Sequence, residues 1–109
     1  MAEKLKIDEF KKLELKVGEI LEANPHPNAD RLYVLKVRIG AEERQVVAGI
    51  RAHYTCEELK GKKVAVVANL ESAVIRGVES QGMVLAASEG DQLTLVIPER
   101  EISSGAVIR

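Results

Sequence analysis

The sequence predicts an all-β fold with short helices, in which the strands curl into a small closed barrel. Aromatic residues are scarce, with one Phe, two Tyr and no Trp, so the core must be aliphatic, and its Val and Ile residues favour strands. Apolar and polar residues alternate in several short runs, which is the period of a half-buried strand. Glycine and proline separate these runs at turn positions. We expect the 109 residues to form one domain, 1–109.

The first predicted elements are a short helix over residues 7–13, capped by Asp8, and a strand that starts at Leu15. The apolar alternation of this strand slips by one residue near Gly18-Glu19. A glycine at such a phase change predicts a β-bulge or a tight bend in a strongly coiled strand.

A loop over residues 24–30 follows, because its two prolines cannot donate to a strand ladder. A hairpin is predicted next, with strands over 32–39 and 44–50 joined by a turn at 40–43. Its basic side chains are expected on one exposed surface: Lys36, Arg38 and Arg44. These side chains either bind a polyanion or only keep the surface solvated.

A second short helix is indicated by the capping-box pattern of Thr55 and Glu58, and it ends at Gly61. Further strands are predicted over 63–69, 83–87, 93–97 and 106–108. Three strands, a short helix and then more strands is the order of the OB-fold, a five-stranded Greek-key barrel. We expect the barrel at about residues 14–90, with an N-terminal extension before it and a C-terminal extension at about 91–109.

The segment 69–88 (NLESAVIRGVESQGMVLAAS) connects two apolar runs. Gly77 and Gly82 relieve steric limits on the backbone, so a ligand or another chain can approach closely. The segment offers the planar, charged guanidinium group of Arg76. It also offers short hydrogen-bonding side chains on Asn69, Ser80 and Gln81. This mixture suits recognition of an anion or a base edge, and the alternative is an ordinary connecting loop.

The formal net charge is −1, but the charge is unevenly distributed. From Arg31 to Arg76 there are nine basic and five acidic residues, a balance of +4, and the rest of the chain carries −5. A local basic patch matters more to a polyanion than the global sum does. In an OB-fold, strands two and three and the loops around them bind oligonucleotides, so this patch is expected on the binding surface.

Other classes of function find little support in the sequence. His26, His53 and Cys56 are the candidates for a metal or nucleophile site, but their spacing is not that of a zinc site, so we expect no metal, no cofactor and no enzymatic activity. The single cysteine fits a reducing compartment. No run resembles a signal peptide or a membrane span, so the expected location is cytoplasmic, with no membrane partner.

Six motifs then occur together: LELKVGEI at 13–20, HPNADRLY at 26–33, RQVVAGI at 44–50, LKGKKV at 59–64, NL at 69–70 and RGVESQGM at 76–83. With them the chain resembles the structure-specific tRNA-binding domain, from residue 7 to residue 109. That domain occurs as a freestanding dimer, as the C-terminal domain or separate beta subunit of methionyl-tRNA synthetases, and in the cytokine-precursor subunit of eukaryotic synthetase complexes. The ending 107–109 also resembles the C-terminus of the methionyl synthetase version.

The resemblance implies a non-catalytic module that recognises the outside corner of folded tRNA by shape. In the family's recognition loop, an Asn, a basic residue, a Ser and a Met fall here on Asn69, Arg76, Ser80 and Met83. Phosphate contacts are expected from basic side chains: Lys36, Arg38, Arg44, Lys63 and Arg76. Asn69 and Ser80 would bond a base or a 2′-hydroxyl, while Met83 either packs on an exposed base or belongs to the barrel core.

The chain departs from the family in one stretch of this loop. Many members carry Lys-Pro-Ala-Lys where this chain has Glu-Ser-Ala-Val at 71–74. Each lost phosphate contact weakens binding and flattens its salt dependence, so we expect weaker tRNA binding than in a basic member. The missing proline at Ser72 also predicts a more mobile loop.

Three expectations concern partners. The apolar segment 93–108 predicts a homodimer; alternatively, this segment covers the base of its own barrel.

A separately encoded methionyl-tRNA synthetase catalytic chain is a further expected partner. The domain would raise the affinity of that chain for tRNA through effective concentration. The rival function is that of a dimeric OB-fold chaperone or other protein-binding module, although the bacterial secretion chaperone of this fold departs from the HPNAD and SQGM motifs.

Overall fold

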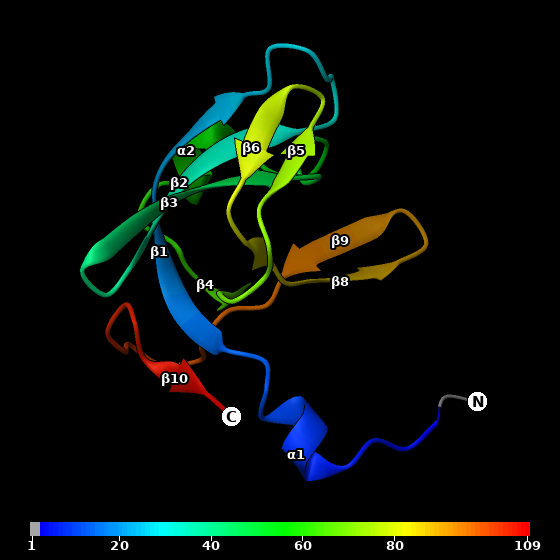
Figure 1. Cartoon of the computed structure of the whole chain (residues 1–109). Helices are drawn as coiled ribbons and strands as arrows, with labels where there is room; N and C mark the ends of the chain where they lie inside the picture. The colour runs from blue at the N-terminus through cyan, green and yellow to red at the C-terminus, as the bar shows by residue number, and fades with distance from the viewer. Residues whose placement is uncertain (1–2) are drawn as a thin grey trace.

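A curled antiparallel sheet forms most of the barrel wall in the computed structural model, which describes residues 3–109 (Figure 1). Its strands lie in the order β3-β2-β1-β4-β7, with β10 also paired to β1. Their bounds are β1 Leu15–Pro25, β2 Tyr33–Ile39, β3 Glu42–Ala48, β4 Lys63–Val67, β7 Met83–Val84 and β10 Val107–Ile108. The predicted all-β, OB-fold architecture is therefore confirmed.

Two hairpins and two short helices complete the fold. The hairpins are β5 Ala73–Ile75 with β6 Val78–Ser80, and β8 Ala86–Glu89 with β9 Gln92–Leu95. The helices are α1 Ile7–Phe10 and α2 Cys56–Leu59. The N-terminal helix is shorter than the predicted 7–13, and none of the helices in residues 3–109 has the length and apolar character needed to cross a membrane. The stretch 69–82, expected as a loop, instead contains the β5–β6 hairpin.

The core is aliphatic, as the composition predicts. Its fully buried side chains are Ile20, Leu35, Val37, Val46, Leu59, Val64 and Val66. Burying each of them contributes about 1.5–3 kcal/mol relative to leaving it exposed. Leu59 comes from α2, which the predicted capping box starts: the Thr55 amide donates to Glu58 Oε1 (2.8 Å) and the Glu58 amide donates to Thr55 Oγ1 (3.2 Å).

The irregularity in β1 lies in a different place from the one predicted. The register against β2 shifts between Ile20 and Glu22, not at Gly18. Gly18 has another purpose, because a Cβ built there would lie 2.6 Å from Val37 Cγ1 and 2.9 Å from Val66 Cγ2. Close packing between strands, not a slip of the backbone, requires this glycine.

The barrel is closed at the seam between β3 and the β6–β7 connection, partly by side chains. The Gln81 amide donates to Gln45 O (2.7 Å), and the Gln45 amide donates back to the side-chain Oε1 of Gln81 (3.0 Å). Two positions further along β3, the Val47 amide donates to Ser80 Oγ (2.9 Å). These bonds dock the β5–β6 hairpin on the edge of β3.

The C-terminal segment packs on the barrel's own base. The Gly105 amide donates to Val17 O (2.7 Å), and the Val17 amide donates to Ala106 O (2.9 Å). Ser104 Oγ accepts from the Gly40 amide and donates to Arg38 O, both at 2.9 Å. Residues 104–106 are therefore bonded to the barrel itself, while Ile97, Ile102 and Val107 of the same segment stay exposed.

Candidate nucleic-acid interface

The β5–β6 hairpin projects beside the barrel and turns at Arg76 and Gly77 (Figure 1). Ile75 pairs with Val78 across the turn, and the φ angles of Arg76 and Gly77 are 53° and 89°. Two central residues with positive φ are the geometry of a type I′ turn, whose twist matches the flanking strands. Arginine is an uncommon residue there, because non-glycine residues with positive φ are usually Asn or Asp.

The tip of this hairpin is held by the loop between β1 and β2. His26 in that loop is only 3% exposed, and its Nε2 lies 2.9 Å from Ile75 O. The Asn28 amide donates to His26 Nδ1 (2.9 Å), so Nδ1 is the acceptor and Nε2 carries the hydrogen donated to Ile75 O. Both ring nitrogens of this buried histidine are therefore satisfied.

Asn28 and Arg76 bind each other reciprocally. Arg76 Nη2 donates to Asn28 O (3.1 Å), and Asn28 Nδ2 donates to Arg76 O (3.3 Å). The Arg76 side chain stays exposed and keeps its other donors free for a ligand. From the sequence, His26 was a candidate for a metal or nucleophile site, and both His26 and Asn28 belonged to the HPNADRLY motif. Nothing in the sequence indicated that they contact residues almost fifty positions away.

Ser80 differs from its predicted role. The residue is only 4% exposed, so its side chain is out of reach of a ligand. Its hydroxyl accepts from the Val47 amide and donates to Gly82 O (3.1 Å). The expected direct contact with RNA therefore does not fit its position. The hydroxyl instead closes the barrel seam.

The Asn69 side chain is also used inside the protein. Its Oδ1 accepts from the Glu14 amide (2.8 Å) and its Nδ2 donates to Lys12 O (2.6 Å). Although the residue lies at the surface, these bonds tie the segment before β1 to the end of β4. The predicted base or 2′-hydroxyl contact thus competes with a structural one.

Two of the predicted phosphate-binding residues are tied to the protein in the same way. Arg44 pairs with Glu42 and donates to Ala68 O. Lys63 pairs with Glu101 and donates to Ile102 O, which holds the C-terminal segment against β4. Both side chains are half-buried around these contacts.

Lys36 and Arg38 lie exposed on β2, as predicted, but each has a carboxylate beside it. Arg38 Nη2 is 2.8 Å from Glu19 Oε1. Lys36 is opposite Glu22 in the β1–β2 register, and both line a shallow depression together with Glu43. The surface of this ribbon is therefore less positive than the count of its basic residues suggests.

Met83 lies at the surface, which decides between the two predicted roles. It is 46% exposed, so it is not part of the barrel core. It lines a shallow groove of about 300 Å³ between the end of β3 and the β7–β8 segment, together with Ile50 and Leu93. Met83 is available to pack against a ligand there.

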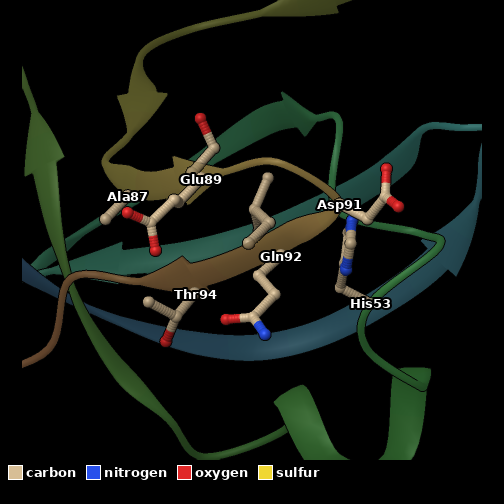
Figure 2. Close-up of a pocket in the computed structure, with 8 residues that line it drawn as sticks. His53, Ala87, Glu89, Asp91, Gln92 and Thr94 are labelled. Carbon is tan, nitrogen blue, oxygen red and sulfur yellow. The ribbon is translucent and has the colours of Figure 1, made fainter.

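The β8–β9 hairpin borders a larger depression of about 600 Å³, which Figure 2 shows with Glu89, Asp91 and His53 among its lining side chains. Two carboxylates make it a poor site for a phosphate. Within residues 3–109, no group of three or more His, Cys, Asp or Glu side chains is arranged to hold a metal ion. Cys56 is half-buried beside Tyr33, where burial raises the pKa of the Tyr33 hydroxyl and the neighbouring Cys56 adds to this effect.

The curled sheet, closed by a hairpin whose tip presents an arginine, defines a small OB-fold module of the class that binds nucleic acids. The family model described as "Putative tRNA binding domain" matches residues 15–107, and the chain belongs to this family. The domain is therefore a tRNA-binding domain related to those of methionyl-tRNA synthetases.

Named relatives agree with this assignment. The chain is 55% identical to a "Methionine--tRNA ligase" of Thermococcus kodakarensis over 98% of its own length, and it spans 14% of that relative. It is 38% identical to the crystal structure of a MetRS related protein from Pyrococcus horikoshii, with a TM-score of 0.92 and coverage of 99% of this chain and 100% of that one. A chaperone CsaA from Picrophilus torridus is also similar, at 28% identity and a TM-score of 0.89, over 97% of this chain and 100% of that one.

Proposed function

We propose that the chain is a non-catalytic module that recognises folded tRNA by shape and serves methionyl-tRNA synthetase as an auxiliary domain or subunit. The observation that carries the proposal is the arginine-tipped hairpin, which His26 and Asn28 hold in one orientation. A preorganised donor loses little conformational freedom when it binds phosphate. The absence of catalysis is supported by the relatives named as ligases, which this chain matches over only about a seventh of their length.

Folded RNA is favoured over loose single strands because exposed aromatic side chains are scarce. Single-stranded nucleic acids are usually held by stacking bases on aromatic rings. Tyr33 is buried and Tyr54 is half-buried, while Phe10 lies on α1, away from the hairpin (Figure 1). Phosphate contacts and the shape of the RNA surface then supply the recognition.

The proposed residues divide into two roles. Direct contacts come from the exposed side chains Arg76, Lys36, Arg38 and Met83. Positioning is assigned to the side chains with partners inside the protein: Asn69, Ser80, Arg44 and Lys63. Glu71 in the loop before β5 adds a negative charge near the RNA, so modest affinity is expected.

A tRNA gel shift across a salt series tests this proposal. The affinity of the wild type should fall steeply as the salt concentration rises. Arg76→Gln should weaken binding and reduce the slope of log K against log salt concentration by about 0.7–0.9, the change for one lost phosphate contact. Lys11→Gln on the distant α1 segment is the control that removes one charge elsewhere (Figure 1). Binding that ignores salt, or equal effects of the two variants, would overturn the proposal.

Partnership with a synthetase rests on the named relatives. Joined to a catalytic chain, the domain would raise the local concentration of tRNA at the active site and act in the cytoplasm, where tRNA is charged. Fusing it to a methionyl-tRNA synthetase that lacks such a domain should lower the KM for tRNA and leave kcat unchanged. An unchanged KM would argue against this role.

A homodimer is proposed because apolar side chains stay exposed along the C-terminal segment: Val96, Ile97, Ile102 and Val107. Exposed apolar surface of this kind suits an interface. Sedimentation equilibrium should give a dimer for the wild type and a monomer for Ile97→Lys. Val74→Lys, which changes an exposed valine on β5, should remain dimeric, and a monomeric wild type would exclude the proposal.

The second candidate is binding of polypeptide, favoured by the similarity to chaperone CsaA and by the apolar groove beside Met83. Competition between an unfolded polypeptide and tRNA for the chain separates the two functions. Displacement of polypeptide by tRNA supports the first, and preference for the polypeptide supports the second.

A further inference from the structure

We propose that Arg31 and Arg51 join Arg76 in one arginine cluster, built on the loop between β1 and β2, which binds neighbouring phosphate groups of the tRNA backbone. This inference rests on the proposed function and adds two contact residues to it. It depends on the fold, which brings Arg51 and Arg76 from two other elements to the loop that carries Arg31.

Two of the arginines donate to neighbouring carbonyls of the same loop. Arg76 Nη2 donates to Asn28 O (3.1 Å), and Arg51 Nη1 donates to Ala29 O (3.3 Å). Since Asn28 and Ala29 are consecutive, the two guanidinium groups approach one stretch of backbone from different elements. Arg76 comes from the β5–β6 turn, whereas Arg51 follows β3.

Arg31 belongs to the same turn. The Leu32 amide donates to Ala29 O (3.4 Å), which closes a turn over residues 29–32 with Arg31 inside it. Arg31 is exposed. The carbonyl that closes this turn is the one that accepts from Arg51, so two arginines donate to this loop and the third belongs to it.

The charge of the cluster is largely uncompensated within the protein. The ion pairs found in residues 3–109 join Arg38 to Glu19, Arg44 to Glu42 and Lys63 to Glu101, and none of them includes a member of the cluster. Asp30 is the carboxylate in the loop itself, which leaves a local balance of three positive charges against one. An anionic ligand would offset this excess of positive charge.

The members are also preorganised. The guanidinium of Arg51 lies 6.0 Å from the ring centroid of Tyr33, a buried residue, which limits its freedom. His26, buried under the hairpin, bonds to both Asn28 and Ile75 and joins the loop to the hairpin tip. Guanidinium forks held in this way match the oxygens of a phosphate.

The test measures tRNA binding by the full chain at several salt concentrations for Arg31→Gln, Arg51→Gln and Arg51→Lys. Each Gln variant should weaken binding and reduce the salt slope by about 0.7–0.9, because one phosphate contact is lost. Arg51→Lys should keep the slope, because the charge remains. Lys11→Gln, far from the cluster, should behave as the wild type.

The outcomes separate this inference from the proposed function. If the wild type binds tRNA with a steep salt dependence but Arg31→Gln and Arg51→Gln keep the wild-type slope, the cluster is excluded and the function stands. If the wild type fails to bind tRNA, both are overturned. Should Arg51→Gln unfold on loss of its bond to Ala29, Arg31→Gln still decides, because the Arg31 side chain is exposed at the surface.

Asn28→Ala tests the preorganisation separately. This change removes the bond to Arg76 O while leaving every charge in place. Weaker tRNA binding is expected in the wild-type background, and no further loss in the Arg76→Gln background, because the two residues act as a unit. Equal losses in both backgrounds would show that Asn28 does not act through Arg76.

Discussion

Single polar side chains decide whether the hairpin is correctly docked, and Ser80 is the clearest example. Its hydroxyl is the partner of the Val47 amide, which lies in the buried seam between β3 and β6. Removing this oxygen leaves a buried donor without a partner. The role of Ser80 is therefore expected to appear first in stability.

Ser80→Ala should lower the free energy of unfolding by about 1–3 kcal/mol, the cost of a buried unsatisfied group. Urea denaturation measures this change. Ser72→Ala, at an exposed serine in the loop before β5, is the control and should leave stability unaltered. A Ser80 variant as stable as the wild type, yet impaired in tRNA binding, would restore the direct contact predicted from the sequence.

Arg76 presents the opposite case, because its backbone geometry favours other residues. At a φ of 53° an asparagine is accommodated more readily than an arginine. Arg76→Asn should therefore leave thermal stability unchanged or slightly raised, since relief of strain offsets the lost bond to Asn28 O, while tRNA affinity falls. Calorimetry and gel shifts measure the two effects, and a variant that binds tRNA normally would remove Arg76 from the interface.

At the scale of elements, Asn69 connects two segments distant in the sequence. It ties the stretch before β1 to the end of β4 through Glu14 and Lys12. Asn69→Ala should make the Glu14 amide exchange its hydrogen roughly five- to tenfold faster, because a bond worth about 1 kcal/mol is lost. Reduced tRNA affinity with unchanged exchange at Glu14 would instead identify Asn69 as a contact residue.

The elements themselves were largely predictable from local patterns. The alternation in 32–39 identified β2, and the Thr55–Glu58 pattern identified the start of α2. The β5–β6 hairpin was missed because its strands have only three residues each and its turn carries Arg-Gly in place of the usual Asn-Gly. Gly18 was misread because close packing and a bulge both favour glycine, and only the neighbouring strands distinguish them.

The binding residues were harder to predict than the fold. Their residue types were visible in the sequence, but their partners were not. Arg44, Lys63, Asn69 and Ser80 each have partners between 24 and 57 positions away, so the sequence had no means of separating positioning residues from exposed ones. His26 was hidden for the same reason, since its partner Ile75 lies on another element.

At the scale of the whole molecule, a slightly acidic protein presents positive charge at one end. The loop between β1 and β2 and the β5–β6 hairpin lie together at that end, and α1 lies at the other (Figure 1). Local charge steers a polyanion more than the net value does. The depression on the β8–β9 hairpin carries Glu89 and Asp91, so we expect the RNA backbone to bind elsewhere.

Recognition of the folded shape rather than of loose strands is the central claim of the proposed function. Binding of an intact tRNA should be compared with binding of an unstructured RNA of the same length, at one salt concentration, so that the charge on the two ligands is matched. We expect tighter binding of the tRNA, because aromatic stacking platforms are lacking and the arginines are fixed in space. Equal affinity for the two RNAs, or preference for the unstructured one, would rule out recognition of the folded shape.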